Sequence, residues 1–409
     1  MRVCMVAYAF YESDSRIMRY AETLAQRGDQ VDVIALRRDG QAASGVVSGV
    51  NVFRLQRRSP NTAGKFLYLL GIVLFFLRAM VLLTRRHLAG RYQLVHVHSV
   101  PDFLVFAAWF PKFTGARIIL DIHDLLPEFY ASKYGTAPGS LLYRSLVLTE
   151  RVSAMFSDYV IAANDLWQDR LISRSVRKER CSAMVNVPDE VVFSPQGRTR
   201  NDAKFIILYP GTLNWHQGVD IAIRAFALVA GEVPEAEFHI YGEGPYKAAL
   251  EQLVRELGLQ TRVKISGFVS IRAVARLIEN ADLGVVPKRK DGFGDEAFST
   301  KIMEFMALGV PVIIPDSRID IYYFNDAIAR FFKGGDERDL AQAMLALIRQ
   351  PELRRQLATN ALHFVESNNW GQMKVQYLAL VDSLGCEPAK AFGPSSEPAR
   401  VTEHEFRER

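Results

Sequence analysis

Strand-like apolar runs alternate with helical patterns along this chain, and the alternation restarts after residue 200. The runs of the first set lie at residues 2–8, 31–36, 51–55, 94–98, 117–122 and 158–162. Those of the second set lie at residues 205–209, 237–241, 263–266, 282–287 and 310–314. Such alternation is typical of a parallel sheet with crossover helices. We therefore predict an α/β fold of two facing, Rossmann-like, doubly wound domains, with a boundary near residue 200 and a ligand cleft between them.

The composition is that of a globular protein: 49% of the 409 residues are hydrophobic and 23% are charged. The three cysteines, Cys4, Cys181 and Cys386, lie too far apart for a metal or redox motif, so we expect free thiols in a reducing cytoplasm. The amino-terminal residues read as a strand at once, and we therefore expect no signal peptide.

Two carboxylates, Glu296 and Glu304, are separated by seven residues near the end of the second set of strands. Ser299 or Thr300 is a plausible N-cap, and apolar residues at helical spacing follow. A helix that begins there presents unpaired N–H groups to an anion, and Lys301 adds a positive charge. The expected ligand is a sugar nucleotide, with carboxylates on hydroxyls and with amides and Lys301 on phosphate. The alternative is that Glu304 lies on a solvated face.

The residues around this pair resemble the family 4 retaining glycosyltransferases, which carry the same Glu spacing, a small-residue helix and a Gly-x-Pro strand. Further similar segments cover most of residues 1–384. They are YPGTLNWHQG (209–218), YGEGPYKAAL (241–250), ISGFVS (265–270), LDIHDLLPE (120–128) and an opening with Asp-x-Arg at Asp14 and Arg16.

The resemblance implies a GT-B fold and transfer of a sugar from a UDP- or GDP-sugar to an acceptor hydroxyl, with retention of configuration and without a metal or other cofactor. It implies catalytic roles for His123, Asp124 and Glu296, with the first two lying against the donor sugar and Glu296 on its hydroxyls. Glu304 is expected to bind the ribose. The other implied nucleotide-sugar ligands are Lys301, Ser299, Thr300, Gly211, Thr212, Gln217, Gly242, Gly244, Phe268 and Arg16.

Domain limits follow from the same resemblance. Residues 1–200 form the acceptor-side domain and residues 201–369 the nucleotide-sugar domain. A helix at 370–384 returns to brace the first domain, and the polar residues 385–409 are expected to form a disordered tail.

The chain departs from the family at the diphosphate. Relatives commonly supply an Arg and a Lys from the first loop of the second domain, whereas Thr212 and Gln217 stand at those positions here. Lys301 and the helix amides would then carry more of the charge, with Lys288, Arg289 and Lys290 as helpers. Arg16 is a further candidate, although a surface ion pair with Glu12 or Asp14 explains it equally well.

His96 and His98 point to the same face of one strand, which makes a metal pair conceivable. The sequence offers no third ligand at a suitable spacing, so we expect ordinary strand residues.

Residues 37–91 hold ten Lys or Arg and one acid, and an uninterrupted apolar run at 66–83 contains a single charge. Basic flanks around an apolar helix favour an anionic membrane surface over nucleic acid as partner. Because strands of one sheet precede and follow the run, a single membrane crossing is not expected. A buried core helix, or a helix with one face packed and one in lipid, remain the two interpretations. The expected place of the protein is the cytoplasm, peripheral at the inner face of the plasma membrane, with a lipid-linked or other saccharide acceptor in exopolysaccharide or surface-glycan synthesis.

Three other functions remain open. Paired carboxylates also serve glycoside hydrolases, GT-B folds include sugar-nucleotide epimerases, and the missing Arg and Lys fit a non-catalytic partner.

Overall fold

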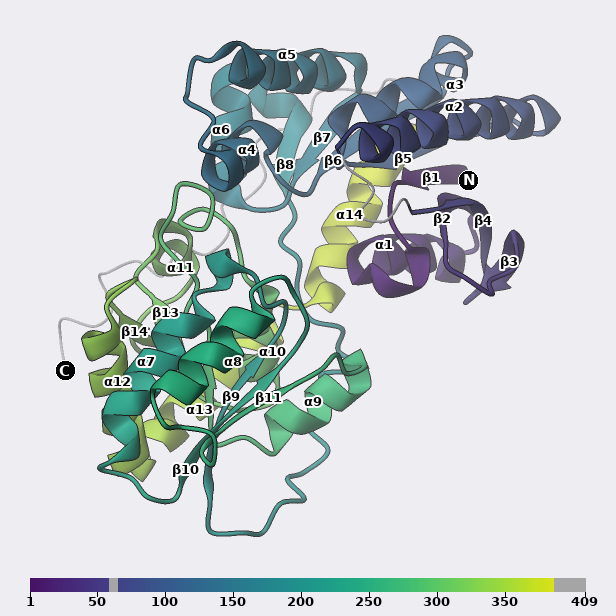
Figure 1. Ribbon diagram of the computed structural model, residues 1–409. Coiled ribbons are helices and arrows are strands. Elements are labelled where there is room, and N and C mark those ends of the chain that lie inside the picture. The colour runs from purple at the N-terminus through teal and green to yellow at the C-terminus, as the bar shows by residue number, and fades with distance from the viewer. Residues whose placement is uncertain (59–64, 386–409) are drawn as a thin grey trace, which may run out of the picture.

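The computed structural model describes residues 1–58 and 65–385, and it shows two sheets, each covered by helices (Figure 1). The first sheet has the strand order β3-β4-β2-β1-β5-β6-β7-β8. Its strands are β1 (Arg2–Ala7), β2 (Gln30–Arg37), β3 (Ser44–Val47), β4 (Val50–Arg57), β5 (Leu94–His98), β6 (Arg117–Ile122), β7 (Tyr159–Ala162) and β8 (Cys181–Ala183). All neighbours pair in parallel except β3, which is antiparallel to β4.

The second sheet is wholly parallel, with the order β11-β10-β9-β12-β13-β14. Its strands are β9 (Phe205–Pro210), β10 (Ala236–Tyr241), β11 (Val263–Ser266), β12 (Leu283–Val285), β13 (Val312–Pro315) and β14 (Arg330–Phe332). The predicted α/β class with two parallel-sheet, Rossmann-like units is therefore confirmed.

Helices join successive strands as crossovers, except those that follow β14, the last strand. Those of the first unit are α1 (Ser15–Gln26), α2 (Lys65–Ala89), α3 (Trp109–Phe113), α4 (Leu126–Tyr134), α5 (Leu141–Phe156) and α6 (Asp165–Arg174). Those of the second are α7 (Val219–Ala230), α8 (Lys247–Glu256), α9 (Ile271–Glu279), α10 (Thr300–Ala307), α11 (Arg318–Tyr323), α12 (Glu337–Arg349) and α13 (Pro351–Ser367).

The last helix, α14 (Trp370–Gly385), returns to the first sheet, where Tyr377 and Val381 join its buried core. The Tyr377 hydroxyl lies 3.0 Å from Nδ1 of His96. The expected tail and Cys386 lie outside the described residues, whereas Cys4 and Cys181 are buried free thiols.

Helix α2 has two apolar faces. Ile72, Phe75, Ala79 and Leu83 are buried in the core of the first unit, at the spacing of one helix face. The opposite face stays exposed through Leu67, Leu69, Leu70, Val73, Leu74, Leu77 and Val81. Within the described residues, Leu67–Ala89 is the one stretch long and apolar enough to cross a membrane, and 28% of its most apolar window is buried. The interpretation as a wholly buried core helix is therefore wrong.

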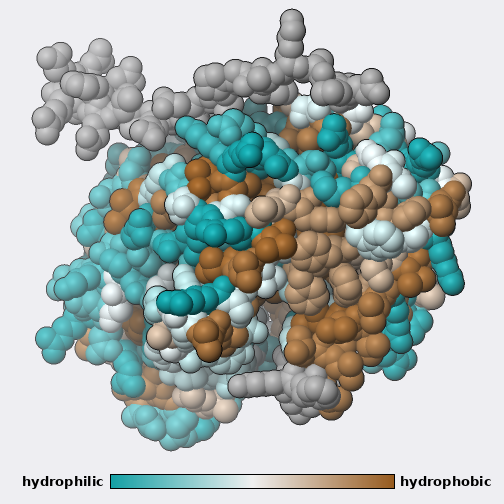
Figure 2. All heavy atoms as spheres, turned by 90° about the horizontal axis from the view of Figure 1, so that it is seen from above, coloured by the Kyte–Doolittle hydropathy of each residue, from teal (hydrophilic) through white to brown (hydrophobic). Residues whose placement is uncertain are grey.

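Large apolar side chains are also exposed on neighbouring helices. They are Trp109 and Phe113 of α3 and Leu141, Leu148 and Met155 of α5. Helices α2, α3 and α5 lie at the same end of the molecule (Figure 1). Figure 2, which looks down on that end, shows a broad hydrophobic area there. We call the exposed side chains of α2 and α3 the apolar face.

Candidate functional site

The first unit contributes a buried ionic network at the carboxyl ends of β5 and β6. Asp121 is fully buried, and both of its oxygens accept hydrogen bonds from Arg16 of α1, each at 2.8 Å. The third guanidinium nitrogen of Arg16 donates to the Met184 carbonyl at 2.6 Å. The expected surface ion pair of Arg16 with Glu12 or Asp14 is wrong, because Arg16 is buried and pairs with Asp121. Each guanidinium nitrogen of Arg16 already has an acceptor within the protein. Arg16 therefore stabilises the fold in this structure.

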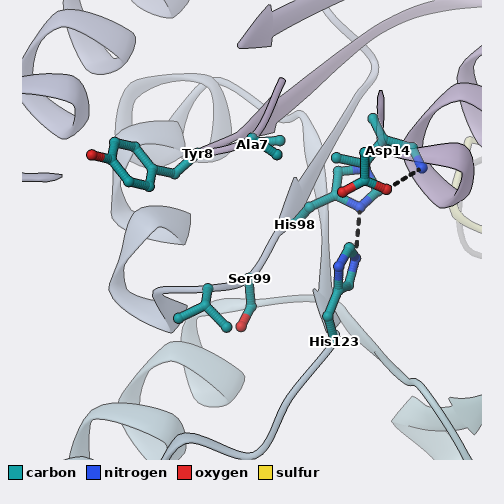
Figure 3. A pocket seen from close by; sticks show the side chains of 9 residues that line it. Ala7, Tyr8, Asp14, His98, Ser99 and His123 are labelled. Atoms are coloured by element: carbon teal, nitrogen blue, oxygen red, sulfur yellow. Dashed lines mark hydrogen bonds between the residues drawn. The ribbon is translucent and has the colours of Figure 1, made fainter. Parts of the chain in front are cut away.

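His123 extends this network toward a small pocket. Its Nε2 lies 3.1 Å from Asp121 and 3.3 Å from Nδ1 of His98. Figure 3 shows His98 and His123 beside Asp14 at this pocket, which is large enough for one or two water molecules, at about 20 Å³. The Asp14 carboxylate also accepts the Ile17 amide at 3.2 Å, which caps α1.

The charges of this network shift its pKa values in opposite directions. Burial lowers the pKa of His123, but Asp121 outweighs it and the pKa ends above its ordinary value. Burial would raise the pKa of Asp121, yet Arg16 and His123 hold it well below the usual range. The pKa of His98 is lowered, chiefly by burial. His123 is therefore the histidine of this group that carries a proton most readily.

The structure supplies the third metal-ligand candidate that the sequence did not show, because His96, His98 and Asp121 come together in space. All three are buried, and the Arg16 guanidinium occupies the Asp121 carboxylate. A cation would have to compete with that guanidinium, so the group does not fit a resident metal.

Asp124 follows β6 and is partly exposed at the same strand end. Burial raises the pKa of its carboxyl to about 6, with His123 opposing the shift. It therefore changes charge close to neutral pH.

The second unit contributes the amino end of α10. Ser299 is its N-cap as predicted, but its side chain makes no capping hydrogen bond and its Oγ is buried without a partner. Thr300 begins the helix, and Lys301 follows. The Lys301 amine lies 3.1 Å from Oε1 of Gln217 and 5.7 Å from the centre of the Tyr209 ring. In the described ranges no carboxylate forms an ion pair with it, and burial lowers its pKa.

The loop after β9 closes around this lysine. Tyr209 donates its hydroxyl to the Thr212 carbonyl at 2.9 Å, and Gln217 lies 3.2 Å from the same hydroxyl. Gly211 has a φ of +152°, and a Cβ there would lie 2.2 Å from Cε of Lys301. The fold thus brings Lys301 together with three residues of the loop that were predicted from one motif: Gly211, Thr212 and Gln217.

The turn after β10 packs against that loop. A Cβ on Gly242 would lie 1.8 Å from the Gly211 carbonyl oxygen, so glycine is required for the close approach. Gly244 approaches Leu213 in the same way. Phe268, just beyond β11, is 81% exposed and leaves its ring free for stacking. The predicted loops therefore line one end of the second sheet.

Glu304 lies one turn further along α10 and faces the first unit. Burial raises its pKa, while Lys301, Thr300 and Arg19 oppose the shift. Arg19 comes from α1, so its charge acts on Glu304 across the gap between the units. Arg19 is buried, its Nε has no partner, and burial lowers its pKa to about 10.

Glu296 lies in the turn before α10, as predicted, and it is 4% exposed. Its carboxylate accepts from Arg170 of α6, in the first unit, at 2.5 Å and from Arg318 of α11 at 2.7 Å. The two glutamates therefore both face the other unit, but Glu296 is already ion-paired.

The three expected helpers of the diphosphate are paired within their own unit. Lys288 is buried and bonds to Asp320 at 3.0 Å, Arg289 bonds to Asp220 at 2.7 Å, and Lys290 to Asp316 at 3.1 Å. The structure does not support their predicted role at the diphosphate, because each of these cations already forms an ion pair with a neighbouring acid.

Four residues at the site were missed by the sequence analysis: Asp121, Arg19, Arg170 and Asp291. Arg19 lies three residues after Arg16 on the same helix, which was a usable signal. Each of the other three has at least one partner more than 70 residues away in sequence: Arg16 for Asp121, Glu296 for Arg170, and Ser132 and His216 for Asp291.

Two family models match this chain. "Glycosyl transferase 4-like domain" covers residues 13–186 and "Glycosyl transferases group 1" covers residues 193–364. Among curated proteins, an uncharacterized glycosyltransferase of Methanocaldococcus jannaschii is 25% identical over 72% of this chain and 74% of its own length. The putative colanic acid biosynthesis glycosyltransferase WcaL of Escherichia coli is 26% identical over 46% of this chain and 47% of its own.

Solved structures share the fold. Sucrose-phosphate synthase from Thermosynechococcus elongatus superposes with a TM-score of 0.76 at 19% identity, over 94% of this chain and 99% of that one. The Anabaena protein HepE, solved in complex with UDP-glucose, superposes with a TM-score of 0.71 at 16% identity, over 93% of this chain and 99% of that one.

Proposed function

Because this chain belongs to the family 4 glycosyltransferases with the GT-B fold, we propose that it transfers a sugar from a UDP- or GDP-sugar to an acceptor hydroxyl with retention of configuration. The observation that carries the proposal is Lys301 at the amino end of α10. This cation forms no ion pair within the described residues, and it lies beside a loop that only glycine allows to approach so closely. The relative in colanic acid biosynthesis and the UDP-glucose complex support polysaccharide synthesis and a UDP-sugar donor.

In this proposal the diphosphate lies against the first amides of α10 and the Lys301 amine. Both stabilise the negative charge that develops on the β-phosphate as the glycosidic bond breaks. Glu304 accepts hydrogen bonds from the ribose hydroxyls, and the Phe268 ring stacks on the base. The leaving phosphate can take the acceptor proton, so the reaction needs no separate base and no bound metal.

The donor sugar would extend from α10 toward the pocket of the first unit. His123 donates a hydrogen bond to a sugar hydroxyl, because its raised pKa favours the protonated ring. Asp124 accepts from another hydroxyl in its ionised form. Glu296 is proposed to affect transfer more than nucleotide affinity, since it lies in the turn before α10 and touches the first unit.

The test is product analysis with candidate donors. Purified protein is screened with UDP- and GDP-sugars by thermal shift, because a ligand that binds the folded state raises the midpoint. The stabilising donor is then incubated with a lipid-linked saccharide, and the anomeric configuration of the product is determined. A glycosylated acceptor with retained configuration supports the proposal. Free sugar alone would indicate a hydrolase, altered donor alone an epimerase, and no nucleotide binding a non-catalytic protein.

A membrane-bound acceptor is supported by the apolar face. Strands β4 and β5 flank α2 in sequence and lie in one sheet, so the helix lies along a surface instead of crossing it. Arg85 is exposed near the end of α2, and Lys112 of α3, which lies between Trp109 and Phe113 in sequence, pairs with Asp158 at 3.1 Å. Apolar side chains bordered by aromatic and basic groups are suited to an anionic lipid interface. We therefore propose that the protein lies at the cytoplasmic face of the membrane.

Vesicle sedimentation tests this placement. Binding to vesicles that contain anionic lipid is expected to fall with added salt and with Leu77→Glu or Arg85→Glu. Arg338→Glu, an exposed arginine on α12, is the matched control and should bind like the wild type. Arg86 is unsuitable for charge reversal because it bonds to the buried Asp32 at 3.1 Å. Equal binding by all variants would contradict the apolar face as the contact.

A further inference from the structure

The turn that carries Glu296 belongs to the second unit by sequence and is held from both units. Within the second unit, Lys288 donates to the Gly294 and Ala297 carbonyls at 3.1 and 2.8 Å. We call residues 291–297 the donor loop. Phe293 meets Phe129 of α4 edge to face, with ring centres 5.3 Å apart, and lies 5.6 Å from Trp167 of α6. Phe293 and Ala297 pack against the core of the first sheet instead of the second. The apolar side chains of the loop therefore tie it to the other unit.

Polar contacts cross the boundary at both ends of the donor loop. The Ser132 hydroxyl of α4 donates to Asp291 at 2.8 Å. The Asn164 side-chain amide, at the start of α6, donates to the Glu296 carbonyl at 3.0 Å. These contacts fix the backbone that leads into α10.

Two arginines meet the Glu296 carboxylate, and they differ in origin and geometry. Arg170 of the first unit uses Nε and Nη2 on the two oxygens, at 3.1 and 2.5 Å, so it fixes the carboxylate plane. Arg318 of the second unit reaches one oxygen at 2.7 Å, and its side chain is 64% exposed against 35% for Arg170. Arg170 therefore orients the Glu296 carboxylate from the first unit. Arg318 adds a positive charge from the second unit, to which Glu296 itself belongs.

We propose that Arg170 is a positioning residue for sugar transfer: by holding Glu296 and the donor loop from the first unit, it makes the donor-sugar site complete only when the two units are closed on each other. The nucleotide end of the site, Lys301 and Glu304, lies on α10 and does not contact Arg170. The proposal rests on the proposed transferase function.

The test compares Arg170→Ala, Arg170→Lys and the matched control Arg318→Ala. Three quantities are measured on the full chain: hydrogen exchange of the peptide that spans residues 289–299, the Kd of UDP and GDP, and kcat and KM of transfer. Arg170→Ala should speed exchange of the donor loop and lower kcat by about 10- to 100-fold, because small misplacements at a reacting centre are costly. The nucleotide Kd should change by no more than about twofold, since the amides and charges of α10 are untouched. Lysine keeps the charge without the planar fork and should restore only part of the rate.

The control separates orientation from charge. Arg318→Ala removes a guanidinium from the same carboxylate and should leave exchange and kcat within about threefold of the wild type, as exposed ion pairs contribute little. Equal losses in Arg170→Ala and Arg318→Ala, or unchanged exchange in Arg170→Ala, would overturn the proposal. If the wild type neither binds nor turns over a nucleotide sugar, the transferase proposal fails, whereas loop exchange still tests the contact between units.

Discussion

Arg16 and Lys301, one on each side of the gap between the units, differ in how their charges are paired. Arg16, on the first unit, has an acceptor for every nitrogen and forms a two-pronged ion pair with the buried Asp121. Lys301, on the second, contacts the amide oxygen of Gln217 and the ring of Tyr209 and forms no ion pair within residues 1–58 and 65–385. Burial lowers the pKa of Lys301, while the pKa of Arg16 stays above its usual value because Asp121 outweighs burial.

This difference separates scaffold from site. A buried charge that is fully paired costs most when its partner is removed, and it offers little to a ligand. A cation without a close ion pair, such as Lys301, is stabilised when an anion arrives. Mutation of Arg16 should therefore affect stability first, and mutation of Lys301 should affect binding and catalysis.

The largest effect is expected on stability, when Arg16 is replaced. Arg16→Ala leaves Asp121 buried without its guanidinium and should lower the free energy of unfolding by about 3–5 kcal/mol. Urea denaturation measures the loss. Arg2→Ala is the control, because Arg2 is half-exposed and lies 3.8 Å from Asp32. A stability change below that of the control would mean that Arg16 is not a scaffold residue.

The next largest effect is expected on catalysis, when Lys301 is replaced. Lys301→Ala should lower kcat about 100- to 1,000-fold, because the charge on the leaving diphosphate loses the cation at the amino end of α10. Steady-state kinetics measure it, with urea denaturation to show that the fold is kept. Lys290→Ala serves as control, since that lysine pairs with Asp316. A Lys301 variant with normal kcat would show that the diphosphate binds elsewhere.

Glu304 tests the nucleotide end of the site. Glu304→Ala should weaken UDP or GDP binding about 10- to 100-fold, as expected when charged hydrogen bonds to the ribose are lost. Glu296→Ala should leave the same affinity nearly unchanged and slow transfer. Calorimetry measures the nucleotide affinity of both variants. If Glu296→Ala weakens binding and Glu304→Ala does not, the roles assigned to the two glutamates are exchanged.

The smallest effect concerns pH. Burial raises the pKa of Asp124 to about 6, so its carboxylate is lost as the pH falls through that value. If the ionised form accepts a sugar hydroxyl, kcat/KM should fall by about tenfold per pH unit below 6 and level off above it. Asp124→Asn should be slow at every pH and lack this limb. An unchanged limb in the variant would assign it to another group.

Much of the fold was predictable because the central strands are continuous apolar runs, and their predicted limits lie within two residues of those observed. The three missed strands, β3, β8 and β14, each lie at an edge of a sheet and have three or four residues. A short strand that pairs on one side only carries less of the long apolar signature, although β11, also at an edge and four residues long, was predicted at its observed limits.

The site was predictable where one motif holds its residues, as for Lys301 and Glu304 on α10. Contacts made by distant segments were not. The partner of Arg16 lies 105 residues away and that of Glu296 lies 126 residues away, so neither spacing nor periodicity could indicate them. The two faces of α2 show the same limit, because the apolar run alone could not tell which face packs.

The central claim is that the amino end of α10 holds the diphosphate of a nucleotide sugar. A crystal structure with UDP or GDP bound tests it most directly. The account predicts phosphate oxygens within hydrogen-bond distance of the Thr300 and Lys301 amides and of the Lys301 amine, with the ribose at Glu304. A nucleotide bound away from α10, with Lys301 still on Gln217, would contradict it.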